Sequence, residues 1–593
     1  MSDQAMRYYE RELAYIRKEL GAFAEQHPQH AAQLQINRSS VEDPNISRLI
    51  EGMALLTAKT EQHLDEQFPD LVQDLFSLLY PGMLELAPSY FPLRLTPDSE
   101  QLNETQCLPA GSLVSVAMSD EQECHFTTVA DLNIYPFVLK NITAEAAPFS
   151  TLPPASLHGT EAVIQLHLHC ADVQAQFNQL ELADLELYVN GFEGNAEPLI
   201  DILLEHSSCI TLSDPAGKVH SEISLDSMVN RATQTDFQWL SKHSNQFSGF
   251  DLLRDYFSYP DKSAYFKITD FGSHAVHFTE SELILNIYVT QLPAEFLRLF
   301  DNKVFSLYTV PAINRFSQAG EPMQYDASSL AMRVICDAQA QSSLEVIAVE
   351  AVYEIDAYGE HRLNPLYKQR YGDDPNQRKW QSRQRWDTRG DRAVEISVSI
   401  DEQELSRETI TLALDLVCAN GRAPCTIVKG SEVTNLTATD LPGGLSVAAV
   451  PTGPIYPDIR EDLYWRFIAL LNANFSSLLD SEDSVAALQN MLALCNQGRD
   501  SKQVSAVKAL AFSPTVGSVQ VDNKPIFSSG SLIKLTLDKR QLATSSSVFA
   551  RVLNVFLQQF CSYDRFIQLQ IKHFGDDSYS KEFKAVQGSQ LCL

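Results

Sequence analysis

Near its start the chain carries an apolar seam that constrains how the molecule can fold. Within residues 8–28, YYERELAYIRKELGAFAEQHP, the apolar residues are spaced by 4, 3, 4 and 3, the repeat of one side of an α-helix. A seam of this kind requires a partner, which is either another helix of the same chain or a helix of a second subunit. The seam residues are Tyr9, Leu13, Ile16, Leu20 and Phe23.

A second helix with a similar seam is predicted shortly afterwards. Asp43 is suited to capping this helix, and Pro44 is suited to its first turn. A third helix is predicted over 69–82, where Pro81 and Gly82 would end it. Residues 1–86 are therefore expected to form a helical segment. The seam of the second helix consists of Ile46, Leu49, Met53 and Leu56, followed by Thr60 and Leu64.

After Pro88 the sequence changes to runs with the two-residue alternation of β-strands, separated by turns. Further helices are predicted between them, so we expect an α+β fold with mainly antiparallel sheets. Strands are expected at 162–169, 282–289, 393–400, 410–417, 532–537 and 566–571, and helices at 197–206, 250–258, 461–480, 484–495 and 546–560.

The length of 593 residues predicts several domains. The segment 354–392, rich in Tyr, Arg, Gln and Asp, is the best candidate for a long loop or domain boundary. The expected division is a helical segment at 1–86, a first α+β domain at 87–275, a β-rich domain at 276–392 and a C-terminal α+β domain at 393–593.

The formal net charge of −31 argues against binding to nucleic acid or to an anionic membrane surface, because both repel a negative protein. The N-terminus is charged where a signal peptide would be apolar, and no run of 18 apolar residues occurs. Ten scattered cysteines without a CxxC pair are typical of reduced, mostly buried thiols. We therefore expect a cytoplasmic protein with no direct membrane insertion.

No sequence motif of catalysis or cofactor binding is present: there is no phosphate-binding loop, no GxSxG and no HExxH. His167 and His169 share one strand face, but a third metal ligand is not visible there, and Cys170 points away from them. Cys418 and Cys425 are too far apart in sequence for a zinc knuckle and are interpreted as buried thiols. We predict no catalytic, cofactor-binding or metal-binding residue.

One basic segment stands out in this acidic chain. Residues 368–392 hold eight Lys or Arg against four Asp, with Tyr371, Trp380 and Trp386 interleaved. Such a pattern can grip single-stranded nucleic acid. An acidic partner or the acidic parts of this same chain would satisfy the charges equally well, and we favour that interpretation.

Several stretches together resemble the TssF family, also called VasA or ImpG, of bacterial type VI secretion baseplate proteins. They follow the family order from end to end of the chain, and it is their number and order that make the resemblance specific. The chain departs from the family at VCANGRAP, 417–424, where the family commonly has a Cys-Thr-Asn-Arg type of turn, and matches loosely at 371–392. The resembling stretches include 8–28, 43–89, 248–262, 305–326, 455–479 and 547–571.

The resemblance implies a non-enzymatic structural subunit of the cytoplasmic baseplate, similar in architecture to the wedge proteins of contractile phage baseplates. It implies that two copies join one TssG subunit in a wedge core. The wedge would associate with TssK and TssE, and six wedges would surround the VgrG spike, on which tube and sheath assemble. The baseplate would dock at the inner-membrane complex through its partners.

Wedge cores of this type are held by helix bundles shared between subunits, so the two N-terminal seams are candidate interface elements. Packing of the two helices against each other inside one chain is the alternative. Two further functions stay open, which are a baseplate protein of a phage tail or related contractile machine, and a cytoplasmic enzyme whose site is assembled from distant residues.

Overall fold

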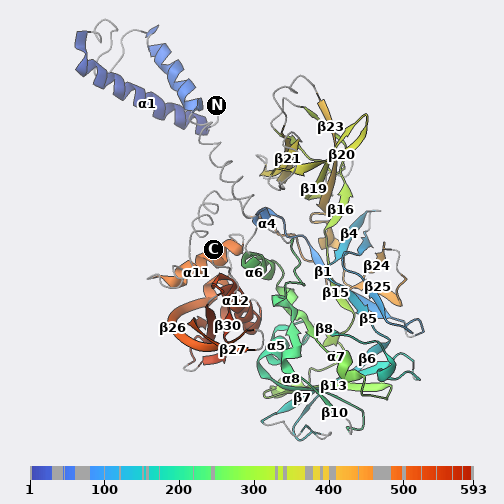
Figure 1. The fold of residues 1–593 in the computed structure, drawn as a ribbon. Helices are drawn as coiled ribbons and strands as arrows, with labels where there is room; N and C mark the ends of the chain where they lie inside the picture. Colours follow the sequence, from blue (N-terminus) through green and yellow to red (C-terminus); the bar gives the residue numbers. More distant parts are fainter. Residues whose placement is uncertain are drawn as a thin grey trace. The chain divides into compact units, whose positions relative to one another are not determined.

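The computed structural model divides the chain into two compact units, a small N-terminal one up to residue 79 and a large one from residue 80 onward (Figure 1). The described residues are 3–29, 44–45, 47–60, 81–98, 100–118, 122–149, 153–154, 159–172, 174–217, 220–241, 248–326, 331–337, 344–366, 378–386, 392–399, 409–437, 440–457, 483–496, 502–521, 524–542, 544–563, 565–576 and 579–588.

The N-terminal unit contains the two predicted seam helices. Helix α1 (Asp3–Gln26) includes the first seam, and a second helix covers the described residues from 44 to 60. The predicted cap Asp43 and the predicted helix over 69–80 lie outside the described residues. In the large unit, Pro81 and Gly82 begin the short helix α4 (Pro81–Leu84) rather than only ending one, because proline fits the first helical position.

Six antiparallel strands of the large unit close into a barrel, which Phe91 and Phe126 fill with rings packed edge to face at 4.7 Å. Its strands come from three of the four predicted segments. The predicted boundaries after residues 275 and 392 therefore do not separate this barrel, because pairing joins strands that are distant in sequence. In order, the strands are β1 (Tyr90–Pro97), β15 (Thr309–Ile313), β4 (Glu123–Thr128), β3 (Leu113–Ala117), β24 (Glu432–Asn435) and β25 (Gly443–Val447).

A second sheet has five antiparallel strands, and the predicted strand at 162–169 lies inside it. Gln165 lies on the same face of this strand as His167 and His169, which are partly exposed, but Gln165 itself is buried. Its amide donates to Asn286 Oδ1 at 3.1 Å, and Asn286 donates to Ser213 Oγ at 2.8 Å, so a polar ladder crosses the sheet and satisfies these groups. The strands are β10 (His220–Ile223), β9 (Ser207–Ser213), β13 (Glu282–Val289), β7 (Ala162–Cys170) and β6 (Phe137–Ala146).

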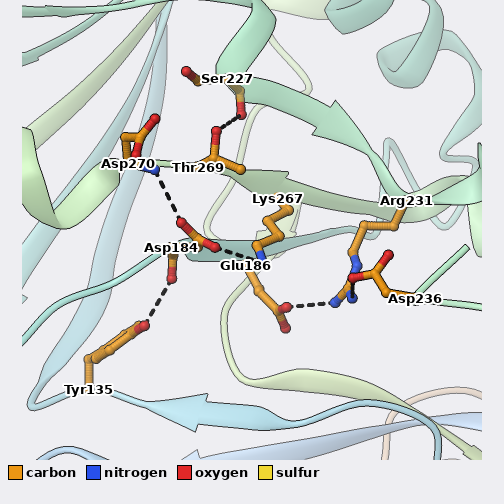
Figure 2. A network of polar contacts seen from close by, with 9 residues as sticks. All are labelled: Tyr135, Asp184, Glu186, Ser227, Arg231, Asp236, Lys267, Thr269 and Asp270. Atoms are coloured by element: carbon orange, nitrogen blue, oxygen red, sulfur yellow. Dashed lines mark hydrogen bonds and ion pairs between the residues drawn. The ribbon is translucent and has the colours of Figure 1, made fainter. Parts of the chain in front are cut away.

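A four-stranded sheet, whose strands alternate along the chain with those of the second sheet, carries several ion pairs, in which Arg231 is the most deeply buried side chain (Figure 2). Arg231 contacts Glu186 at 2.6 Å and Asp236 at 3.5 Å, and Lys267 contacts Asp184 at 2.7 Å. The Arg231 guanidinium also lies 3.8 Å from the centre of the Phe237 ring. The strands are β11 (Met228–Asn230), β12 (Tyr265–Ile268), β8 (Leu185–Val189) and β14 (Phe305–Ser306).

An eight-stranded sheet occupies residues 316–419. It contains most of the described part of 354–392, so the prediction of a long loop there was wrong. The many charged residues obscured the alternating pattern of a strand in which Trp380 is buried. The strands are β16 (Phe316–Ala319), β23 (Thr409–Ala419), β19 (Glu345–Asp356), β20 (Gly359–Pro365), β21 (Lys379–Trp386), β22 (Arg392–Val398) and β18 (Met332–Arg333), with β17 (Met323–Asp326) also on β23.

The C-terminal domain, here the described residues 483–588, packs a helix on a sheet. Helix α12 (Ser546–Phe560) buries one apolar face, and its Phe549 ring stacks on Tyr256 of helix α6 (Ser248–Ser258) at 5.6 Å. The predicted helix at 461–480 lies outside the described residues. The other elements are α11 (Ser484–Cys495), β26 (Val507–Val521), β27 (Lys524–Leu537), β28 (Phe566–His573), β29 (Tyr579–Glu582) and β30 (Val586–Gln587).

Polar contacts join the C-terminal domain to a helix that lies between strands β8 and β9 in the chain. Helix α5 (Glu197–Asp201) continues as a π-helical turn η2 (Ile202–His206), and Asp201 and Glu205 accept hydrogen bonds from Ser545 and Ser547 at the start of α12. Lys581 donates to the Leu204 carbonyl at 3.2 Å. Carboxylates at a helix N-terminus are stabilising, so the two elements are held together.

The smaller elements connect these layers. They are β2 (Gln106–Leu108) paired with β5 (Leu132–Ile134), the helices α7 (Phe271–Ala275) and α8 (Ala294–Leu297), and the short turns η1 (Phe177–Gln179), η3 (Leu225–Ser227), η4 (Arg231–Thr233), η5 (Pro260–Ala264), η7 (Ala423–Thr426), η8 (Val504–Ala506) and η9 (Lys539–Gln541).

The ion pair of Arg231 supports a stability prediction. Arg231→Met leaves the Glu186 carboxylate without its main cation, and we expect the free energy of unfolding to fall by about 3–5 kcal/mol in chemical denaturation. Lys584→Met is the matched control, because Lys584 pairs with Asp226 at 2.9 Å while both are more than 80% exposed. A loss for Lys584→Met as large as that for Arg231→Met would contradict the argument, since exposed pairs contribute about 0–1 kcal/mol.

Lys581 supports a pH prediction. Burial, and to a smaller extent the Arg551 charge, lower its pKa from 10.5 to about 8, against the opposing charges of Glu205 and Asp201. Between these two values the unfolded chain binds more protons at Lys581 than the folded chain does, so the contribution of Lys581 to stability rises with pH. Lys581→Met removes this dependence.

We therefore expect the stability advantage of Lys581→Met over the wild type to shrink by at most about 2 kcal/mol between pH 7.5 and 9.5, measured by denaturant titration at each pH. Lys584→Met serves as the control, because that ammonium stays in water in both states. Parallel pH profiles of wild type and Lys581→Met would contradict the prediction.

Candidate subunit interface

The first seam lies along α1 and is partly covered. Its five residues are all half-buried within the N-terminal unit, whereas Tyr15 on another side of the helix is 59% exposed. The Phe23 ring contacts His27 one turn later, with the ring centres 5.3 Å apart. The unit therefore covers this seam only in part. The seam residues are Tyr9, Leu13, Ile16, Leu20 and Phe23.

The second helix has two apolar sides, and they differ sharply in exposure. The buried side consists of Ile50, Ala54 and Ala58, of which Ala54 has no exposed surface. Burial at a spacing of four residues identifies the inward side of a helix. The predicted seam lies on the other side: Leu49 is 65% exposed, Met53 57% and Leu56 71%, and Ile46 lies outside the described residues.

We call Leu49, Met53 and Leu56 the exposed stripe. Large aliphatic side chains at positions i, i+4 and i+7 share one side of a helix, so the three form a continuous surface. The buried side was missed in the sequence because two of its members are small. The spacing Ala54 to Ala58, one turn after Ile50, was the available signal, since small residues allow elements to approach closely.

The candidate metal ligands do not form a site. His169 contacts the Glu282 carboxylate at 3.0 Å, and among the described residues no group of three or more His, Cys, Asp or Glu side chains is arranged to hold a metal ion. Burial lowers the pKa of His167 and of His169. Cys425 was predicted to be buried but is exposed, because it lies in the short turn η7.

Two arginines of the basic segment pair with carboxylates of the same sheet. Arg378 pairs with Glu354, and Arg385 pairs with Glu395 at 3.2 Å. Arg392 donates to the Ile347 carbonyl at 2.9 Å, and the buried Trp380 donates to the Leu363 carbonyl at 3.1 Å. These contacts agree with the expectation that the chain's own acidic residues satisfy the charges. Tyr371 lies outside the described residues.

Asp255 and Lys262 are two deeply buried charges of the large unit that pair with each other. Asp255 accepts hydrogen bonds from the Trp239 and Leu240 amides at 3.2 Å and pairs with Lys262, which is 2% exposed. Burial lowers the pKa of Lys262, and the Asp255 charge opposes that shift. Because this cation and this carboxylate are both enclosed, a substrate in solvent would not reach them. We therefore interpret the pair as a contact that stabilises the fold.

The part of the chain that the structure describes has no helix that is both long and apolar enough to cross a membrane. Among the predicted interface residues that the structure describes, Leu49, Met53 and Leu56 are the most exposed to solvent.

Comparison with known proteins agrees with the resemblance seen in the sequence. A family described as "Type VI secretion system, TssF" matches residues 1–590. The chain is 22% identical over 620 residues to the type VI secretion system component TssF1 of Pseudomonas aeruginosa, and the match covers 100% of both proteins.

Solved structures show the same fold. A chain from the TssK-TssF-TssG baseplate subcomplex of the type VI secretion system, determined by cryo-electron microscopy, superposes with a TM-score of 0.75 at 20% identity, covering 92% of this chain and 99% of that one. A chain from the type VI baseplate complex gives a TM-score of 0.57 at 20% identity, with 96% of each covered. The α+β prediction is confirmed, and the chain belongs to the TssF family of type VI secretion system proteins.

Proposed function

We propose that this chain is a structural, non-enzymatic subunit of the type VI baseplate wedge and that its exposed stripe contributes to a helix bundle shared with partner subunits. The observation that carries the proposal is the stripe of Leu49, Met53 and Leu56, which the N-terminal unit leaves in water. Burying a Leu or Met side chain contributes about 1.5–3 kcal/mol, so a partner that covers all three gains substantially.

The finer assignment follows the family. Two copies of this chain would join one TssG subunit, and the wedge would bind TssK and TssE, surround the VgrG spike with five others and nucleate tube and sheath assembly. The relatives named above, a TssF1 component and a TssK-TssF-TssG subcomplex, support the TssG and TssK partners. The subunit would work in the cytoplasm, with the baseplate docked at the inner-membrane complex.

The family match favours a secretion baseplate over a phage tail. The described residues also offer no metal-binding group of three or more ligands for the enzyme alternative. The net charge of −31 suggests that assembly requires partners whose charges suit an acidic surface. Polar contacts between subunits would then let the wedge rearrange when the sheath contracts.

The stoichiometry can be tested directly. Co-expression with a TssG-type protein, followed by size exclusion and light scattering, is expected to give a stable complex of two copies of this chain and one partner. A well-behaved monomer that ignores the partner would contradict the wedge assignment while leaving the family membership intact.

The exposed stripe can be tested with substitutions that keep the helix. In the triple variant Leu49→Gln, Met53→Gln and Leu56→Gln, the helix propensity is nearly unchanged, and no buried residue is altered. We expect an unchanged far-ultraviolet spectrum and thermal midpoint, with affinity for the partner reduced at least about 100-fold, since tenfold corresponds to about 1.4 kcal/mol. Affinity is measured by titration calorimetry.

Two further variants make this result decisive. Tyr358→Gln removes an apolar side chain that is 93% exposed on the eight-stranded sheet, and its affinity should equal that of the wild type. Leu13→Asp with Leu20→Asp tests the half-buried seam of α1. A folded protein that has lost its partner places that seam in the shared bundle, whereas an aggregated monomer makes it internal core.

A further inference from the structure

Two sulfur atoms meet inside the eight-stranded sheet, although 82 residues separate them in the chain. The Cys418 thiol donates to Cys336 Sγ at 3.1 Å. Cys418 lies in β23 with no exposed surface, and Cys336 follows β18 and is 6% exposed. Both belong to the apolar core of this sheet, together with Leu416 and Ile396. All nine described cysteines, including these two, are unbonded thiols.

The two cysteines lie near opposite ends of the strand order of this sheet. The strand order runs β16, β23, β19, β20, β21, β22, β18, so Cys418 lies near one end of the sheet and Cys336 follows the strand at the other end. Contact between them means that the sheet is rolled up until its two ends meet. In this subsection, the seam means this junction between the two ends of the sheet and not the apolar seams of the N-terminal helices.

Among the described residues, no strand pair closes the seam, in contrast to the closed barrel of β1. Near it, the Glu321 amide donates to the Ile335 carbonyl at a long 3.3 Å. The small residue Gly320 also lies here, because a Cβ at this position would meet the Leu416 side chain at 2.7 Å and the Ile335 carbonyl at 3.4 Å. A covalent bond between the two sulfurs would therefore fasten a junction that, in the described part of the sheet, a long backbone hydrogen bond spans without a strand pair.

The sulfur separation distinguishes two possible uses of the pair. Thiolates on a tetrahedral zinc ion lie about 3.8 Å apart, since each Zn–S bond is about 2.3 Å, and the described residues provide no third ligand. A disulfide needs about 2.05 Å, so the atoms have to close by about 1 Å. Small rotations of the two side chains can supply this, because the backbones already hold the sulfurs in contact.

We propose that Cys336 and Cys418 form an oxidisable dithiol which hydrogen peroxide converts to a disulfide across the seam. The Cys336 thiolate attacks peroxide: an S–O bond forms, the O–O bond breaks, and hydroxide leaves and takes up a proton. Cys418 then loses its proton and attacks the Cys336 sulfenic acid, expelling the second water. Two thiols are oxidised and one peroxide is reduced to two waters.

The roles of the two thiols follow from the hydrogen bond. Because Cys418 donates to Cys336, the pKa of Cys336 is lowered and that of Cys418 is raised. The thiolate is the reactive form, so Cys336 reacts first and Cys418 resolves. Cys209 provides a contrast at the same 6% exposure: burial and the nearby Glu222 carboxylate raise its pKa to about 12, and its thiol donates to that carboxylate rather than to a second sulfur.

The chemical test uses the full chain, first reduced, then treated with hydrogen peroxide, alkylated in denaturant and digested with trypsin without reduction. We expect peptide 334–362 linked to peptide 408–422, each of which contains one cysteine. In Cys418→Ala, the sulfenic acid of Cys336 should instead accumulate and be trapped by dimedone. Cys209→Ala is the matched control and should leave the cross-link yield unchanged.

Recovery of both peptides as alkylated thiols would overturn the proposal, as would a sulfinic acid at Cys336 without a cross-link in the wild type. Links that involve only the exposed Cys107 or Cys425 while Cys336 and Cys418 stay reduced would also overturn it.

The structural consequence has its own readout. In the oxidised wild type, we expect backbone amides of β16, β17 and β18 to exchange with deuterium at least about tenfold more slowly than in the reduced protein, because the seam no longer opens. Oxidised and reduced Cys336→Ala should exchange alike. Equal exchange rates for the cross-linked and reduced wild type would show that the bond forms without fastening the seam.

Discussion

Asp255 is a buried carboxylate in α6, the helix that connects three parts of the large unit. Consecutive residues of α6 point in different directions, because each residue turns about 100° around a helix. Arg254 donates to the Glu85 carbonyl at 2.8 Å, Asp255 holds Lys262 and two loop amides, and Tyr256 hydrogen-bonds Thr544 before α12. One helical turn thus connects the start of the unit, the loop before the helix and the C-terminal domain.

Charges in such a place act through specificity more than through net energy. Removing an arginine or lysine from water costs several kcal/mol, and pairing returns that cost only if every donor and acceptor is well placed. Alternative packings of α6 would leave Asp255 or Lys262 enclosed and unpaired. The apolar contacts of α6 with α12, by comparison, would tolerate a shift along the helix. The buried ions therefore define how these elements meet.

The sequence predicted local structure well and long-range structure poorly, for a physical reason. Period-two and period-3.6 patterns identified strands such as β13 and β23 and the helix α12, because burial of one side is written into neighbouring residues. Nothing local indicated that β1 pairs with both β15 and β25, since partners more than 200 residues away leave no periodic trace. At the site, the seam of large residues was readable in the sequence, whereas the spacing of Ile50, Ala54 and Ala58 was present but easily overlooked, because two of these buried residues are small.

The two units differ in the chemistry of their most prominent contacts. The large unit fixes its internal joints with buried ions such as Asp255 with Lys262 and Arg231 with Glu186, which are unforgiving of displacement. The N-terminal unit instead keeps Leu49, Met53 and Leu56 in water, and under the proposed function these side chains would bind a partner through burial alone. An apolar contact requires no complementary charge, so it can form although this chain has a net charge of −31. Under the proposed function, the internal ion pairs would preserve the fold of the subunit while the apolar contact joins it to its partner.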